Sequence, residues 1–196
     1  ERKLFIHNAG HAICAYLGYL KGYKYIWQAI ADDWIKNIVL NALNESGAAL
    51  IKKYKFKEAE MSEHINDLIK RFGNIALGDS VERVAREPIR KLSPNDRLIG
   101  ASRLAENYNI IPENLSFGIA STLLYNNKND NEAIRLQVML NDKGIQEVLK
   151  EICKIVPGES LEKLILQKFN ELWSGGKIWF HHSLWSQTIN KKLKGV

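Results

Sequence analysis

Three polar side chains near the start of the chain could act together on one small ligand. Lys3, Asn8 and His11 lie in an apolar stretch at Lys-x4-Asn-x2-His spacing. The apolar positions up to Leu20 spread nearly all round a helix, which predicts a helix that is buried on most sides. At about 100° per residue, Asn8 and His11 share one face, and Lys3, about 140° from Asn8, can bend its long side chain toward that face. An amine, a carboxamide and an imidazole could therefore converge on one ligand.

Each of these residues also has a structural interpretation. Lys3 could extend into solvent from a frayed helix end, Asn8 could satisfy a backbone group, and His11 could be a core histidine, because buried polar groups usually serve structure through their hydrogen bonds. One such residue alone favours the structural interpretation. Three at this spacing favour a site.

The composition limits the classes of protein to consider. The chain has 196 residues, 45% hydrophobic and 26% charged, which suits a globular protein of one or two domains. No apolar run approaches the roughly 18 residues of a membrane span, and the first residues do not resemble a signal peptide, so we expect a cytoplasmic protein without membrane contact. The chain has two cysteines, Cys14 and Cys153, which are too few for a disulfide framework. Its histidines lack the spacing of metal ligands, so we expect no metal site. The net charge of +6 favours anionic partners, which include nucleic acid, a nucleotide cofactor and a sugar phosphate.

Helical spacing recurs along the chain without any convincing run of alternating strand residues, which predicts an all-α fold. Lys21-Gly22 should end the first helix, and a glycine at Ser46-Gly47 should let another backbone approach. The further helices expected are Trp27 to Tyr54, with a bend at Ser46-Gly47, Met61 to Phe72, Asp79 to the residue before Pro88, Ser93 to Asn107, Asn114 to Leu124, Asp130 to Leu140, Asp142 to Cys153 and Ser160 to Trp173. We expect the aromatic residues of the tail, Trp179, Phe180 and Trp185, to pack on the helices.

A second cluster of interest is basic. Arg83, Arg86, Arg90, Lys91 and Arg97 crowd a predicted helix-loop-helix junction around Pro88. Such a cluster can bind an anion, but a solvated basic face is an equally good interpretation of the charges alone.

The Lys-x4-Asn-x2-His stretch resembles the signature of the polyol-specific long-chain dehydrogenase and reductase family. Further pieces that match are Ala42-Leu-Asn-Glu-Ser-Gly47, Arg71-Phe72, Val81-Glu-Arg-Val84, Arg86, Pro88, Arg90-Lys-Leu-Ser93 and Asp96-Arg-Leu-Ile99, so the resemblance covers Glu1 to about Cys153. It implies a multi-helical orthogonal bundle of the 6-phosphogluconate dehydrogenase C-terminal-like type over residues 1–196. It also implies an N-terminal Rossmann domain of the same polypeptide as partner, because this chain has no G-x-G-x-x-G turn after a strand.

The resemblance assigns roles to the matched residues. Lys3 is implied as the general base, Asn8 and His11 as ligands that polarise the reacting oxygen, and Arg83 and Lys91 as substrate-binding residues. A lysine acts as a base near neutral pH only when burial lowers its pKa. The apolar helix predicts such burial for Lys3.

The implied reaction is an NAD-dependent, zinc-independent interconversion of mannitol 1-phosphate and fructose 6-phosphate. A phosphate dianion calls for the paired donors of arginine, and relatives that act on free mannitol lack bases at the positions of Arg86 and Arg90, which we therefore expect to bind the phosphate. The same family also allows free mannitol and fructose, or a sugar acid, as substrates. Outside the family, a basic helical module that binds nucleic acid and a helical interaction scaffold remain as alternatives. The first predicts basic residues along an exposed recognition helix, whereas this chain clusters them at a junction.

Overall fold

The domain is built from helices, with one isolated β-bridge between Tyr25 and Ser80 in the part that the computed structural model describes, residues 1–174. The elements in chain order are η1 (Lys3–Asn8, a π-helix), α1 (Ala9–Leu20), α2 (Ile26–Ala31), α3 (Asp33–Tyr54), α4 (Glu58–Phe72), η2 (Ile75–Leu77, a 3-10 helix), α5 (Val81–Ala85), α6 (Pro88–Lys91), α7 (Ile99–Asn107), α8 (Glu113–Leu123), α9 (Asn131–Lys143), α10 (Ile145–Cys153) and α11 (Ser160–Ser174). The prediction of an all-α fold is confirmed. The tail aromatics Trp179, Phe180 and Trp185 lie outside the described residues.

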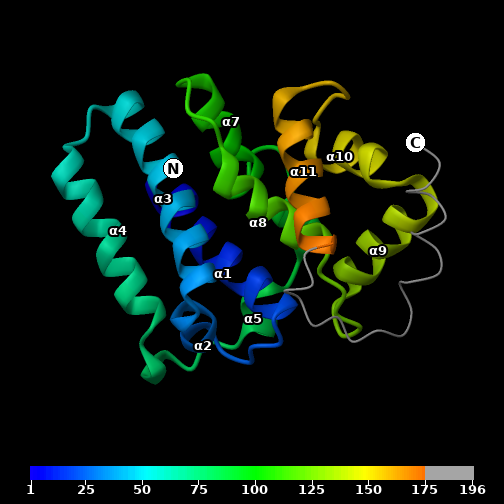
Figure 1. Ribbon diagram of the computed structural model, residues 1–196, viewed down its shortest axis with the longest axis horizontal. Coiled ribbons are helices and arrows are strands. Elements are labelled where there is room, and N and C mark those ends of the chain that lie inside the picture. The colour runs from blue at the N-terminus through cyan, green and yellow to red at the C-terminus, as the bar shows by residue number, and fades with distance from the viewer. Residues whose placement is uncertain (175–196) are drawn as a thin grey trace.

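Helix α1 is the central element (Figure 1). It contacts α2, α3, α5 and α8, and all of its residues are buried except His11 and Tyr19, which are partly exposed. The predicted burial on most sides is therefore confirmed. His11 is the one residue of α1 with an ionisable nitrogen, and it lies at the partly exposed margin of the helix.

Helices α3 and α4 lie side by side at one edge of the molecule (Figure 1). Gly47 on α3 makes their approach possible, because a Cβ at that position would lie 3.1 Å from both Met61 Cγ and Ile65 Cδ1 of α4. The prediction that another backbone approaches here is confirmed. Helix α3 runs unbroken through this point, from Asp33 to Tyr54.

The single helix predicted from Trp27 to Tyr54 is divided at Asp32. Its backbone is extended, with φ −73° and ψ 118°, and its carboxylate accepts hydrogen bonds from the backbone N–H groups of Trp34 and Ile35. Asp32 also pairs with Lys21 and accepts from the Tyr23 hydroxyl. This N-cap, with two further partners, stabilises the break between the two helices.

Other helix starts also differ from the prediction, among them those of α4, at Glu58 rather than Met61, and α5, at Val81 rather than Asp79. Helix α7 begins at Ile99 rather than Ser93, because residues 93–98 form turns. Helix α8 begins at Glu113, and its free N–H groups are capped from α3 by Glu45, which accepts from the backbone of Asn114 and Leu115. Helix α10 begins at Ile145, after Gly144 with φ +83°. Pro88, as expected, ends α5, and it then begins α6 as its first residue.

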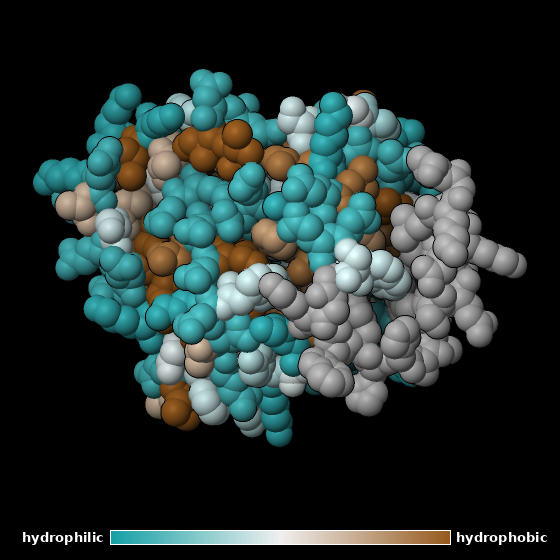
Figure 2. Space-filling model, in the orientation of Figure 1, coloured by the Kyte–Doolittle hydropathy of each residue, from teal (hydrophilic) through white to brown (hydrophobic). Residues whose placement is uncertain are grey.

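Figure 2 shows a mainly hydrophilic face with several separate apolar patches. Within residues 1–174 no helix is both long enough and apolar enough to cross a membrane.

Candidate functional site

The turn that carries Lys3 and Asn8 is a π-helix, which the sequence did not reveal. The N–H of Ala9 donates to the carbonyl of Leu4, five residues back, instead of four. In this wider turn, residues five apart, such as Lys3 and Asn8, lie nearly above one another on the same face. Lys3 therefore approaches Asn8 more directly than the α-helical spacing predicted.

The two residues are open to a ligand. The Lys3 side chain is exposed, and that of Asn8 is half-buried. Neither side chain forms a hydrogen bond or ion pair with any residue in the described range 1–174. The expectation that Lys3 is buried is wrong for this chain, because Phe5 and Ile6 occupy the inward side of the turn.

His11 is held on several sides. Its Nε2 lies 3.2 Å from Asp79 Oδ2, and its side chain is 19% exposed. The ring stacks on Phe72 with centroids 5.0 Å apart and planes 10° apart, and on His7 with centroids 5.8 Å apart. Burial lowers the pKa of His11 from 6.5 to about 4, although the Asp79 carboxylate acts in the opposite direction. The imidazole is therefore neutral at physiological pH.

Asp79 lies between His11 of the Lys-x4-Asn-x2-His stretch and Arg83 of the basic cluster. Its Oδ2 faces His11, and its Oδ1 accepts a hydrogen bond from the guanidinium of Arg83 on α5. Arg83 and His11 thus meet through one carboxylate, although they are far apart in sequence. Sequence reasoning treated Asp79 as a helix start, and that position is taken by the N-cap Ser80. No local pattern indicates that Asp79 faces α1.

Lys91 lies in the interior. Its side chain is buried, its ammonium donates to the backbone carbonyl of Arg86, and it sits 5.9 Å from the ring centroid of Tyr16. Burial, with the charges of Arg97 and Arg90, lowers the pKa of Lys91 from 10.5 to about 8. The structure therefore places Lys91 in the interior, against the Arg86 carbonyl and the Tyr16 ring.

Arg97 is a candidate that sequence reasoning named only as part of the basic cluster. Its positive charge lowers the pKa of both His11 and Lys91, so it lies near both groups. Its guanidinium Nε is 2.7 Å from Asp96 Oδ1, and this ion pair is largely shielded from solvent. The charge of Arg97 therefore acts on His11 of α1 and on Lys91 of α6.

The two arginines predicted to bind phosphate differ in their surroundings. Arg90 lies 2.7 Å from Glu87 and 3.4 Å from Asp96, so its charge is already offset. Arg86 forms no ion pair with residues in the described range. Of the two, Arg86 is the guanidinium without a carboxylate in direct contact, although its charge lowers the pKa of Glu82 and of Glu87.

Two cations, Arg71 and Lys3, lie near His7. Burial, followed by the charges of Arg71 and Lys3, lowers the pKa of His7. Arg71, on α4, has no ion-paired carboxylate within residues 1–174. This surface favours an anionic ligand beside Lys3.

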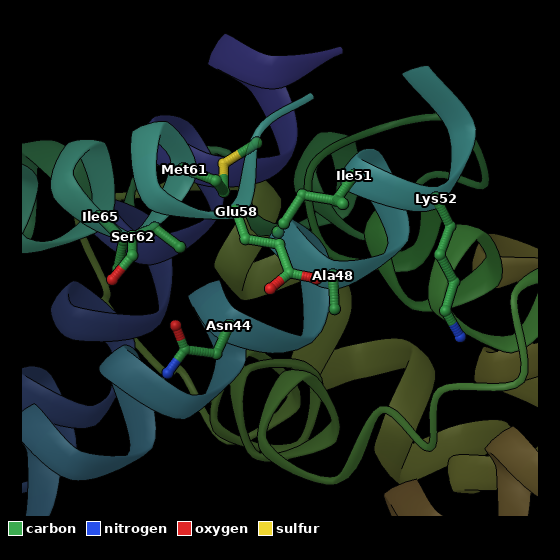
Figure 3. Close-up of a pocket in the computed structure, with 9 residues that line it drawn as sticks. Asn44, Ala48, Ile51, Lys52, Glu58, Met61, Ser62 and Ile65 are labelled. Atoms are coloured by element: carbon green, nitrogen blue, oxygen red, sulfur yellow. The ribbon is translucent and has the colours of Figure 1, made fainter. Parts of the chain in front are cut away.

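A groove of about 250 Å³ lies elsewhere, between α3 and α4 (Figure 3). Its lining consists of Asn44, Gly47, Ala48, Ile51, Lys52, Glu58, Met61, Ser62 and Ile65. None of the predicted site residues contributes to it. Phe72, which stacks on His11, follows Met61 by eleven positions on the same helix, which is about 16 Å along the axis. The groove and the His11 site are therefore separate.

The described residues contain no cluster of three or more histidine, cysteine, aspartate or glutamate side chains that could hold a metal ion. His181 and His182 lie outside that range. The chemistry available at the site is thus that of an amine, a carboxamide, a neutral imidazole and guanidinium groups.

Residues 1–173 match the family model described as the mannitol dehydrogenase C-terminal domain. The chain belongs to this family. Among its relatives, the mannitol-1-phosphate 5-dehydrogenase of Thermoanaerobacter pseudethanolicus is 44% identical over 172 residues, which are 88% of this chain and 44% of the relative. That of Bacillus subtilis is 43% identical over 171 residues, 87% of this chain and 45% of the relative. The chain spans less than half the length of these relatives.

Solved structures share the fold of this C-terminal domain. D-sorbitol dehydrogenase in its substrate-free form matches with a TM-score of 0.71 and 20% identity, covering 90% of this chain and 39% of that one. The Pseudomonas fluorescens mannitol 2-dehydrogenase complex with NAD and D-mannitol matches with a TM-score of 0.68 and 17% identity, covering 100% of this chain and 40% of that one. At these identities the likeness extends to the fold alone.

Proposed function

We propose that this chain is the substrate-binding and catalytic domain of an NAD-dependent dehydrogenase that interconverts mannitol 1-phosphate and fructose 6-phosphate. The observation that carries the proposal is 44% identity with a mannitol-1-phosphate 5-dehydrogenase over 88% of the chain. The side chains of Lys3, Asn8 and His11 at one end of the central helix support it, because they supply a base, a donor and a ligand for hydroxyl groups.

Lys3 acts as the general base in this proposal. In the oxidative direction its neutral amine takes the proton of the reacting hydroxyl, and in the reductive direction its ammonium returns a proton to the alkoxide. Asn8, whose amide is unbonded within residues 1–174, donates to the oxygen as negative charge develops on it. Because Lys3 is exposed here, a second domain must cover it, since desolvation is what disfavours the charged ammonium form of a lysine.

The N-terminal Rossmann domain of the same polypeptide is the proposed cover. NAD, when bound, supplies the hydride acceptor for the reaction. Its pyrophosphate needs a glycine-rich turn between a strand and a helix, and residues 1–174 contain no such unit. The proposal therefore assigns the cofactor mainly to that second domain, and the substrate to this one.

Arg86 is the proposed ligand of the substrate phosphate, with Arg90 as a weaker second. The Glu87 and Asp96 carboxylates contact Arg90 directly, whereas Arg86 forms no direct ion pair within residues 1–174 and acts on Glu82 and Glu87 only through its charge. Lys91 is proposed to contribute through its bond to the Arg86 carbonyl, which fixes the backbone of this segment. Arg83 is proposed to face the substrate together with the His11 and Asp79 pair.

The test uses the full-length enzyme with both domains, assayed with NADH on fructose 6-phosphate and on fructose. The unmutated enzyme should prefer fructose 6-phosphate. Arg86→Ala should lower kcat/KM on fructose 6-phosphate by about 10- to 150-fold, as expected for loss of a charge-assisted contact of roughly 1.5–3 kcal/mol, and should change activity on fructose little. Arg90→Ala should follow the same direction with a smaller effect.

The matched control is Arg103→Ala, because Arg103 pairs with Glu106 and Glu159 on α7 and the turn before α11, away from the proposed site. Its effect should be equal on both substrates. An equal loss on both substrates in Arg86→Ala would assign this arginine to the fold. A preference of the unmutated enzyme for free fructose would instead indicate a dehydrogenase of free mannitol.

A further inference from the structure

The peptide bond between Arg86 and Glu87 is held at both of its polar ends. Its carbonyl oxygen, which belongs to Arg86, accepts a hydrogen bond from the ammonium of Lys91. Its N–H group, which belongs to Glu87, donates to Asp130 Oδ2 at 2.9 Å, although Asp130 lies 43 residues further along the chain. A cation and an anion thus hold one peptide plane between them.

Asp130 is itself fixed at the start of α9. Its side chain is the N-cap of this helix, because Oδ1 accepts from the backbone N–H groups of Glu132 and Ala133. The residue is 8% exposed, so little water competes for the carboxylate. One carboxylate oxygen therefore caps α9, and the other holds the Glu87 N–H.

The backbone of Glu87 needs such a hold, because it is strained. Its φ is +61° and its ψ is 59°, which is the left-handed region that a residue with a Cβ disfavours. Glu87 also precedes Pro88, and a residue before proline favours an extended backbone. A strained conformation persists only where the surrounding structure determines it. The bond to Asp130 is one such determinant.

A second residue of α9 holds the same segment. Glu132 Oε2 accepts from the backbone N–H of Arg90 at 3.1 Å. This N–H lies in the first turn of α6, where the helix offers no carbonyl partner of its own. The contact between α6 and α9 therefore includes two bonds from side chains to backbone, which set where α6 begins.

We propose that Asp130, with Glu132 beside it on α9, is a positioning residue that aims the Arg86 side chain at the substrate phosphate. The proposal rests on the proposed function, in which Arg86 binds that phosphate. The direction of the Arg86 side chain depends on the peptide that follows it, because the carbonyl carbon is bonded to the Arg86 Cα. A planar peptide that is held at both ends cannot rotate without breaking a bond to a charged group.

Capping of α9 alone would make Asp130 a residue of the fold, and Asp130→Ser separates the two roles. Serine is a favoured N-cap, so its hydroxyl keeps the role of Oδ1, but this side chain is too short to reach the Glu87 N–H as well. The matched control is Asp32→Ser. Asp32 caps α3 with Oδ1, and its Oδ2 holds Lys21 and Tyr23, which do not belong to the proposed site.

Amide hydrogen exchange of the chain, followed by nuclear magnetic resonance, tests the bond itself. In Asp130→Ser the Glu87 N–H should exchange about 10-fold faster or more than in the unmutated chain, because it loses a charged acceptor. The N–H groups of Glu132 and Ala133 should keep their protection, because the serine caps them. Unchanged exchange at Glu87 would overturn the proposal.

Kinetics of the full-length enzyme test the link to the phosphate. Asp130→Ser should raise the KM for fructose 6-phosphate by about 10- to 100-fold, because misplacing a binding group by about 1 Å can cost this much. The kcat, and both constants for fructose, should change little, because the phosphate lies away from the reacting carbon. Asp32→Ser should affect both substrates equally. An equal loss on both substrates in Asp130→Ser would assign Asp130 to the fold and overturn its positioning role.

A double-mutant cycle determines whether Asp130 acts through Arg86. In an enzyme that already carries Arg86→Ala, Asp130→Ser should cause no further rise in the KM for fructose 6-phosphate, so the two losses should not add. Additive losses would refute the action of Asp130 through Arg86.

Glu132 provides a second pair of variants, which applies also if the melting curve shows that Asp130→Ser is unfolded. Glu132→Ala removes the acceptor of the Arg90 N–H, whereas Glu132→Gln keeps an oxygen there. Glu132→Ala should raise the KM for fructose 6-phosphate selectively, and Glu132→Gln should restore it. Equal KM values in the two variants would contradict the positioning role of α9. If the unmutated enzyme does not prefer fructose 6-phosphate to fructose, the proposed function fails, whereas the exchange rate at Glu87 decides the bond to Asp130 by itself.

Discussion

The buried neutral state of His11 should make this domain lose stability as the pH falls from 7 to 5. The pKa of His11 is about 4 in the folded chain, against an ordinary value of 6.5 that applies to the unfolded chain. The unfolded chain therefore binds a proton more readily between these values, and the free energy of unfolding falls as the pH falls through this window. The contribution is fully present above about pH 6.5 and is lost as the pH approaches 4.

The magnitude follows from the same two values. One pKa unit corresponds to roughly 1.4 kcal/mol, and between pH 6.5 and pH 5 about 1.5 units of the difference are lost, so His11 should account for about 2 kcal/mol between pH 7 and pH 5. With a side chain only 19% exposed, His11 is weakly screened by solvent. His7 and His64, whose pKa values are lowered mainly by burial, act in the same direction.

The assay is urea unfolding of the chain at pH 7, 6 and 5, followed by circular dichroism, for the unmutated protein and for His11→Gln. The variant lacks the titrating group, so its unfolding free energy should fall by about 2 kcal/mol less than that of the unmutated protein between pH 7 and pH 5. Parallel pH dependences in the two proteins would refute the reasoning. His64→Gln serves as the control, because His64 lies on α4 without contact to Asp79. His64 should account for a smaller part of the change in unfolding free energy between pH 7 and pH 5.

Two further outcomes are expected. In the full-length enzyme, Lys3→Ala should lower kcat by about 10²- to 10⁴-fold, the range for a general base, with little change in melting temperature because Lys3 is exposed. A variant that keeps half of its turnover would exclude Lys3 as the base. Glu45→Ala should lower the free energy of urea unfolding by about 1–3 kcal/mol, because it leaves the N–H groups of Asn114 and Leu115 without their partner. Glu113→Ala is the control, because Glu113 is exposed at the start of α8, the helix that Glu45 caps. It should lower the free energy of unfolding clearly less than Glu45→Ala. Equal losses of unfolding free energy would contradict the capping role of Glu45.

The sequence by itself was sufficient for the fold class and for most helices. Apolar periodicity located the buried central helix, and short-range signals such as Gly22 with φ +76° and Pro88 at the start of α6 marked the ends of elements. The sequence also pointed to Lys3, Asn8 and His11 as a group, since their spacing depends only on the local geometry of one helix. Such features depend on neighbours along the chain, which a single sequence displays.

Only the tertiary structure decided how the site is assembled. The burial of Lys91 and the pairing of Asp79 with His11 have no local signature, because each depends on segments that are distant in sequence. The same holds for the start of α8, which is capped by Glu45 from another helix. The π turn under Lys3 is local, but the apolar spacing of the sequence does not distinguish it from an α-helical turn. Hydrogen-bond partners and burial are set by packing among elements, and packing placed His11 against Asp79 and Phe72 and left Lys3 exposed.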